Sequence, residues 1–99
     1  MTNKLQELPL GQFLMIRALR ETPNFVWPSK AEYATMDQRS ERVTFWRAIP
    51  EKESDLRFVR GGAVIAIKVD CVNTNWRESL TSKAEYIRAV ASMEGRNNA

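Results

Sequence analysis

Residues 56–72, LRFVRGGAVIAIKVDCV, decide the fold of this chain because they combine two apolar strands with a reversal. Leu56 and Phe58 fall on one face of a strand over residues 56–59. The pair Gly61-Gly62 accepts the positive φ angles of a hairpin turn, so residues 60–62 are predicted to reverse the chain. The longest strand follows over residues 63–72, with an apolar face formed by Ala63, Ile65, Ile67, Val69 and Cys71.

A further strand is predicted upstream, over residues 42–49. Alternation places Val43, Phe45 and Ile49 on one face and Arg42, Thr44, Trp46 and Ala48 on the other. The charged segment 50–55 is typical of a turn, and residues 76–80 are compatible with a short fourth strand.

The pentapeptide Ser-Lys-Ala-Glu-Tyr occurs twice, at residues 29–33 and 82–86. Serine followed three residues later by glutamate is a capping box, in which each side chain bonds the backbone amide of the other residue. Both copies therefore predict helix starts, for a short helix over 30–38 and a longer one over 83–93 stopped by Gly95. The surrounding sequence does not repeat, which favours a capping signal over a duplicated domain.

Another helix is predicted to begin at Pro9 and to end at Thr22-Pro23. Apolar side chains cover more than half of its circumference. Such a helix is either buried, which we favour in so short a chain, or it offers a second face to a partner. The candidate partner-binding residues of that second face, with one tryptophan beyond the helix, are Phe13, Met15, Ile16, Leu19 and Trp27.

Together these elements predict an α+β fold. A small antiparallel β-meander of three to four strands packs against a C-terminal helix, with one or two helices in the N-terminal half. The 99 residues are expected to form a single domain, 1–99, with flexible ends at 1–8 and 95–99.

The composition argues against an enzyme. The chain has no histidine and one cysteine, which excludes imidazole-based catalysis, an internal disulfide and a multi-cysteine metal site. We interpret the acidic cluster of Glu51, Glu53 and Asp55 as part of a solvated loop rather than as a cation site. We interpret Cys71 as a small, buried hydrophobic residue. No catalytic residue, metal ligand or cofactor is predicted.

The cellular location of the protein is predicted from the length of its apolar segments and from its cysteine content. The apolar run over residues 13–16 is far shorter than the roughly 18 residues that span a membrane. With one thiol and no export signal, we expect a cytoplasmic protein with no membrane partner. The oligomeric state stays open.

The charge pattern leads to a binding hypothesis. Lysine and arginine total 15 against 12 acidic residues, a net charge of +3, and ten of the cations are arginine, which suits phosphate and carboxylate. We expect the Trp46 ring to lie between arginine side chains on an open face of the sheet. An aromatic ring flanked by guanidinium groups in this way is typical of nucleic-acid contact. The alternatives are a protein-binding surface, or a tryptophan packed under the helices with cations that only keep the sheet edge soluble. The candidate nucleic-acid-binding residues are Arg42, Trp46, Arg57, Arg60, Lys68 and Arg77.

Residues 55–95 carry a resemblance to a known family. A strand ending Arg60-Gly61, the apolar strand 64–67, a polar connection and a helix opened by Ser82 together resemble the enterobacterial cell-division activator family CedA. The resemblance implies a small antiparallel sheet packed on a helix, no catalytic activity, and binding to DNA and the transcribing polymerase. It would place Arg60 and Lys68 at the DNA-facing surface.

Two functions are therefore expected. The first is a non-enzymatic regulatory protein that binds DNA or nucleic-acid machinery through the arginine- and tryptophan-bearing surface. The second is an inhibitor or adaptor that binds a host nuclease, helicase or polymerase by protein contact, because the size and style of the sequence resemble accessory proteins of temperate bacteriophages.

Overall fold

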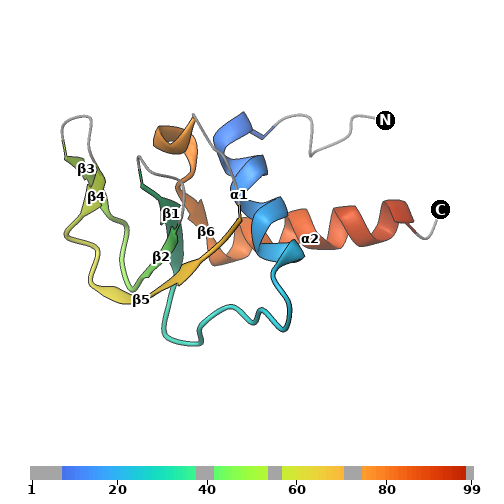
Figure 1. Cartoon of the computed structure of the whole chain (residues 1–99), viewed down its shortest axis with the longest axis horizontal. Coiled ribbons are helices and arrows are strands. Elements are labelled where there is room, and N and C mark those ends of the chain that lie inside the picture. The colour runs from blue at the N-terminus through green and yellow to red at the C-terminus, as the bar shows by residue number, and fades with distance from the viewer. Residues whose placement is uncertain (1–7, 38–41, 54–56, 71–74, 98–99) are drawn as a thin grey trace.

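The computed structural model describes residues 8–37, 42–53, 57–70 and 75–97 (Figure 1). It has two α-helices, a four-stranded antiparallel sheet and a two-stranded sheet, which confirms the predicted α+β class and the C-terminal helix. The elements are α1 Leu10–Glu21, β1 Tyr33–Met36, β2 Arg42–Trp46, β3 Glu51–Glu53, β4 Arg57–Val59, β5 Ala63–Lys68, η2 Trp76–Glu78, β6 Thr81–Ser82 and α2 Lys83–Asn97.

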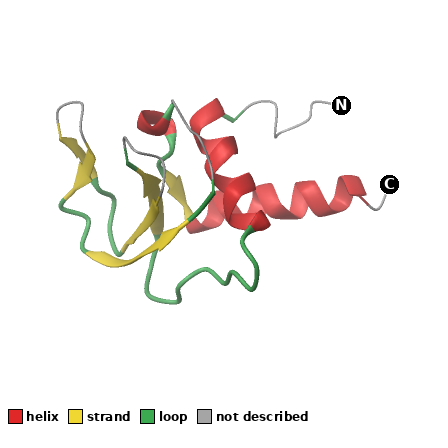
Figure 2. Cartoon of the chain, in the orientation of Figure 1, coloured by secondary structure: helices red, strands yellow, loops and turns green. Residues whose placement is uncertain are grey.

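The main sheet has the order β5-β2-β1-β6, and β3 pairs only with β4 in a separate hairpin. Figure 2 shows α1 and α2 on one side of the main sheet and the β3–β4 hairpin beyond the other. We call these two sides the helix face and the hairpin face. Residues directly opposite in an antiparallel ladder share a face, so Ala34 with Phe45 and Met36 with Val43 belong to the helix face.

Burial explains why these residues form the sheet. All four of those side chains have no exposed surface, and they pack with Met15 and Leu19 of α1. Phe25 stacks on the Phe45 ring at 5.7 Å between centroids, so the segment between α1 and β1 also covers the helix face. The helix face is therefore the main apolar core of the described chain.

The predicted hairpin at residues 60–62 is wrong. β4 pairs with β3 and β5 pairs with β2, so the chain crosses from one sheet to the other at Gly61 and Gly62. The carbonyls of Gly61 and Gly62 accept hydrogen bonds from the amides of Ala48 and Arg47 at 2.9 and 3.0 Å. A Cβ on Gly61 would come within 2.8 Å of the Trp46 ring and of the Ala48 carbonyl oxygen. Glycine thus serves here for close packing against β2 rather than for a two-residue turn.

The predicted helix over 30–38 is also wrong, because residues 33–36 form β1. β1 pairs with β2 on one side and with β6 on the other, so non-local backbone bonds override the local helix signal. The second copy of the pentapeptide behaves as predicted. The Ser82 amide donates to Glu85 Oε1 at 2.9 Å, and the Glu85 amide donates to Ser82 Oγ at 3.1 Å.

Several boundaries differ from expectation. α1 begins after Pro9 and ends at Glu21 as predicted, whereas α2 continues past Gly95 to Asn97. The strand predicted over 42–49 stops at Trp46, and Ile49 is exposed. The strand predicted over 63–72 ends at Lys68, and residues 76–80 hold the 3-10 helix η2 instead of a strand. The apolar face expected for that long strand is partly open, since Ile65 is 48% exposed, and Cys71 lies outside the described residues.

Candidate nucleic-acid interface

Two cations lie directly opposite each other on the main sheet. Arg42 of β2 and Lys68 of β5 are paired in the antiparallel register, and both side chains are exposed. Side chains in this arrangement have Cβ atoms about 5 Å apart, a separation at which like charges repel. No ion pair joins either residue to another described residue. The two side chains therefore place two like charges next to each other, and we call them the cation pair.

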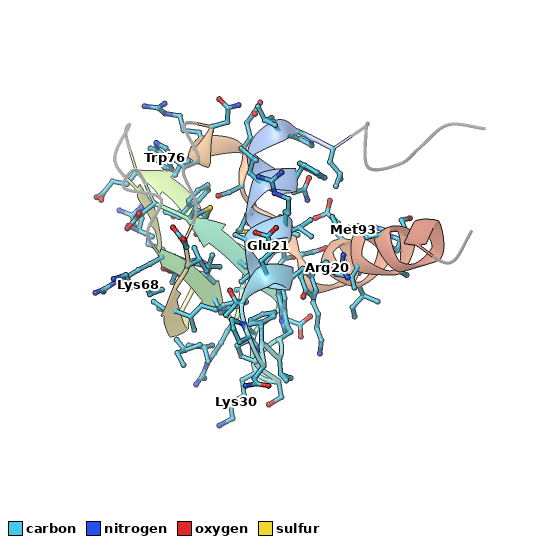
Figure 3. The ribbon with its side chains drawn as sticks, turned by 45° about the vertical axis from the view of Figure 1, so that its right-hand side comes forward. Arg20, Glu21, Lys30, Lys68, Trp76 and Met93 are labelled. Atoms are coloured by element: carbon cyan, nitrogen blue, oxygen red, sulfur yellow. The ribbon has the colours of Figure 1, made fainter. Side chains whose placement is uncertain are left out.

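The hairpin face supplies the surroundings of the cation pair. Alternation places Arg42, Thr44 and Trp46 of β2 on this face. Thr44 is half-buried and its partner Ala66 is exposed, so small side chains separate the cation pair from the covered end of the sheet. Figure 3 shows Lys68 extending away from α1.

Trp46 does not belong to this surface, which corrects the expectation of an exposed ring. The side chain is 8% exposed, and its Nε1 donates a hydrogen bond of 2.9 Å to Thr35 Oγ1 on β1. Gly61 closes over the ring from the hairpin side. The face expected for Trp46 is correct, but the connection to the hairpin covers that end of the sheet. Stacking of a base on Trp46 is thus excluded in this conformation.

Arg60 lies at the crossing between the two sheets. Its φ angle is +65°, a left-handed conformation that is unusual for a residue with a side chain. Its Nη1 lies 3.3 Å from Glu51 Oε2, in an ion pair whose side chains are 68% and 64% exposed. An ion pair this exposed contributes little to stability, so the guanidinium can exchange its carboxylate for a phosphate at small cost.

The remaining predicted cations are placed differently. Arg77 of η2 is exposed and lies over the buried Trp76 ring, with its Cζ 4.9 Å from the ring centroid. Such cation–π contact holds the guanidinium in place. Arg57 of β4 pairs through its backbone with Glu53, and its side chain lies outside the described residues. The structure therefore brings Arg42 and Lys68 together, with Arg60 and Arg77 on other elements.

The expected partner-binding face of α1 is wrong. Met15, Ile16 and Leu19 have no exposed surface, in agreement with the favoured alternative of burial. Phe13 is half-buried against the cluster that joins Ile16 to Ala89 of α2. Trp27 is half-buried too: it meets Phe45 edge to face at 5.0 Å, and its Nε1 donates to the Ala31 carbonyl at 2.8 Å. These five residues hold the core together and offer no continuous apolar surface.

A hollow of about 580 Å³ lies between the ends of α1 and β5. Its lining includes Glu21, Asp70 and Lys68, so charges of both signs meet there. Within the described ranges no group of three or more histidine, cysteine, aspartate or glutamate side chains could hold a metal ion. The hollow has no feature that selects a particular ligand, and its main relevance is that it leaves Lys68 accessible.

Other features were missed at the sequence level. Trp76 is a core residue, 3% exposed, whose ring meets Phe58 of the hairpin edge to face at 6.1 Å. Gly11 of α1 packs directly against the Asn75 carbonyl. A glycine inside an otherwise apolar helix signals such a close approach, and this signal was available in the sequence.

No helix among the described residues is both long enough and apolar enough to cross a membrane. In comparisons with known proteins, the chain matches no protein-family model, no curated protein and no solved structure.

Proposed function

We propose that this chain is a small, basic, non-enzymatic regulatory protein that binds the phosphate backbone of DNA. The single observation that carries the proposal is the cation pair, in which Arg42 and Lys68 face each other without an acidic partner among the described residues. An anion placed between two such cations removes their repulsion and gains two charge-assisted hydrogen bonds. Arg60 adds a third, more distant contact.

The proposed contact is to phosphate rather than to bases. Trp46 is buried, so stacking on it contributes nothing. Arginine and lysine contacts to phosphate fix the position of a protein on DNA but carry no sequence information. Binding should therefore be weakly dependent on sequence and strongly dependent on salt.

The resemblance of residues 55–95 to the CedA family stays a prediction, and it is consistent with this proposal. Under that resemblance Arg60 and Lys68 face the DNA. Both side chains are exposed here. Binding to the transcribing polymerase, which the same resemblance implies, would add a protein partner to the DNA contact.

The test is a salt series of DNA binding, measured by the fluorescence anisotropy of a labelled duplex. Two to three phosphate contacts predict a slope of about −2 to −3 in log K against log salt. Arg42→Ala and Lys68→Ala should each lower the magnitude of the slope by about 1 and weaken binding to all sequences alike.

The matched control is Arg88→Ala, which removes one cation from the exposed face of α2. It should leave both slope and affinity unchanged apart from a small effect of net charge. A slope near zero for the unaltered protein would reject the proposal. An Arg88→Ala effect as large as that of Lys68→Ala would show that net charge, and not the cation pair, governs binding.

A further inference from the structure

The outer edge of β5 is open. β5 stands at the end of the main sheet and pairs with β2 alone, so the backbone on its other side has no strand partner in the described part of the chain. The strand contains no proline, and its only charge is Lys68 at its last position. Edges of this kind pair with another strand unless they are protected. The side chains along β5 therefore determine which strand it accepts.

On the helix face, the open edge is apolar. Ile65 is opposite Phe45 in the antiparallel register, and Ile67 is opposite Val43, so all four side chains share that face. Phe45 and Val43 have no exposed surface, whereas Ile65 is 48% exposed and Ile67 is half-buried. The apolar core thus continues to the edge of the sheet and is left partly uncovered there. A strand added to β5 would place every second side chain beside these two isoleucines.

On the hairpin face, the same edge is basic. Ala66 is opposite Thr44, and Lys68 is opposite Arg42 in the cation pair. The remaining side chains of an added strand would lie beside Ala66 and Lys68, since neighbouring strands are about 4.8 Å apart. Arg42 would then be two strand spacings away, about 10 Å, which is comparable to the Debye length at about 0.1 M salt. A carboxylate on the added strand would therefore be attracted by both cations.

We propose that the edge of β5 binds an extended segment of a partner protein in which apolar residues alternate with acidic residues. The apolar residues of this segment cover Ile65 and Ile67, and the acidic residues lie beside Ala66 and Lys68. Charge complementarity selects this occupant, because a carboxylate relieves the repulsion within the cation pair and forms a charge-assisted hydrogen bond with Lys68. Strand addition supplies affinity through backbone hydrogen bonds and specificity through alternate side chains.

Other occupants fit the edge less well. β5 contains no acidic residue, so β5 of a second copy of this chain would bring another lysine and no carboxylate. DNA offers phosphates to the cation pair but has no peptide backbone for the open ladder and no apolar side chains for the isoleucines. A peptide strand of the proposed pattern matches the backbone, the apolar face and the charges together.

The hollow at the end of β5 indicates where the acidic positions stop. Its lining includes Asp70, just past Lys68 along the chain, and Glu21 at the end of α1. These two carboxylates would repel an acidic side chain that reached the hollow. The acidic residues of the partner are therefore expected along β5 itself and not beyond its end.

The consequence for DNA binding rests on the proposed function. The partner segment and DNA would use the same cation pair, so an acidic strand on β5 should displace DNA. A partner that carries such a segment would act as a competitive inhibitor of DNA binding.

The first test is the fluorescence anisotropy of a labelled, end-capped peptide that is as long as β5 and in which valine and glutamate alternate. We expect saturable binding to the full chain, with slower amide hydrogen exchange in residues 63–68. A peptide in which lysine replaces glutamate is the control for charge, and a peptide with methylated backbone amides is the control for strand pairing. Neither control should bind. No binding of the valine–glutamate peptide, equally tight binding of either control, or protection confined to other residues would overturn the proposal.

Variants of the chain test the two faces separately. Lys68→Ala should weaken peptide binding about two- to fivefold, the effect of one exposed ion pair. Ile65→Thr keeps a β-branched side chain but removes apolar surface, and should weaken binding about fivefold. The matched control is Ile87→Thr, at an isoleucine of α2 that is 55% exposed, and it should bind the peptide as the unaltered protein does. Circular dichroism verifies that the variants are folded, and equal losses in Ile65→Thr and Ile87→Thr would overturn the assignment to β5.

Failure of strand addition is distinguishable from failure of the proposed function. Ile65→Thr should weaken peptide binding and leave DNA binding unchanged, whereas Lys68→Ala should weaken both. If the peptide fails to bind while DNA binds, strand addition is wrong and the proposed function stands; the reverse result rejects the proposed function alone. An excess of the peptide should release a labelled duplex, and simultaneous binding of both would overturn their shared use of the cation pair.

Discussion

The indole nitrogen of Trp46 donates a 2.9 Å hydrogen bond to the hydroxyl of Thr35 across the ladder between β2 and β1, and both side chains are buried. This bond ties the covered end of the hairpin face to the centre of the sheet. It also accounts for the absence of Trp46 from the binding surface, since an exposed ring would leave Thr35 without this partner.

The first prediction concerns that bond. Thr35→Val leaves the indole N–H buried and unpaired, which should lower the free energy of unfolding by about 1–3 kcal/mol. Trp46→Phe should destabilise by a similar amount or more, because it also removes packing. In urea denaturation, the double variant should lose less than the sum of the two single losses. Strict additivity would show that the bond contributes nothing.

The second prediction uses the repeated pentapeptide. Ser82→Ala removes the side-chain half of a formed capping box and should destabilise by about 1 kcal/mol. Ser29→Ala makes the same change in the copy that precedes a strand, at an exposed position, and should change stability by less than about 0.5 kcal/mol. Thermal denaturation of both variants compares them directly, and equal losses would contradict the difference between the two copies.

The third prediction concerns Gly11. Alanine normally stabilises a helix relative to glycine by about 1 kcal/mol. At Gly11 the added Cβ would overlap the carbonyl of Asn75, so Gly11→Ala should instead destabilise by about 1–3 kcal/mol. Glu21→Ala, at the exposed last position of the same helix, is the control and should be close to neutral. A stabilising Gly11→Ala would show that α1 and η2 do not pack as described.

The fourth prediction concerns the strained backbone at Arg60. Its φ of +65° costs a residue with a side chain about 1 kcal/mol, whereas glycine adopts it freely. Arg60→Gly should therefore be more stable than Arg60→Ala in a denaturant titration. At Arg47, which is exposed and has no positive φ, the order should reverse, with alanine the more stable of the two.

The fifth prediction separates the buried and exposed faces of α1. Ile16→Asp places a charge where no surface is exposed and should unfold the protein. Leu10→Asp makes the same kind of change at a leucine that is 53% exposed, near the start of the helix, and should leave the circular dichroism spectrum unchanged. A folded Ile16→Asp protein would restore the idea of a partner-binding face on α1.

Local signals predicted the helices better than the sheet. Pro9, Thr22 and the Ser82 capping box act within a few residues of the boundaries they mark, and α1 and the start of α2 follow them. The first pentapeptide copy carries the same signal, but residues 33–36 gain hydrogen bonds from β2, the next strand along the chain, and from β6, which lies far away at residues 81–82. No local pattern contains that information.

In the candidate site, too, local features were predicted correctly and features that depend on distant contacts were not. Alternation correctly placed Trp46 on the face of Arg42, because the side-chain period of a strand is a local property. Whether that face is open depends on where the hairpin packs. The crossing at Gly61 covers the Trp46 end and leaves the Arg42 end exposed, and this arrangement follows from the pairing of β5 with β2.

The burial of the tryptophans also determines what an optical binding assay can report. Trp46 and Trp76 lie in the interior and Trp27 is half-covered by aromatic neighbours, so DNA held at Arg42 and Lys68 has no indole to stack upon. Adding DNA should leave the intrinsic emission nearly constant. A large loss of tryptophan fluorescence would instead show that the backbone at Gly61 has moved away from the Trp46 ring.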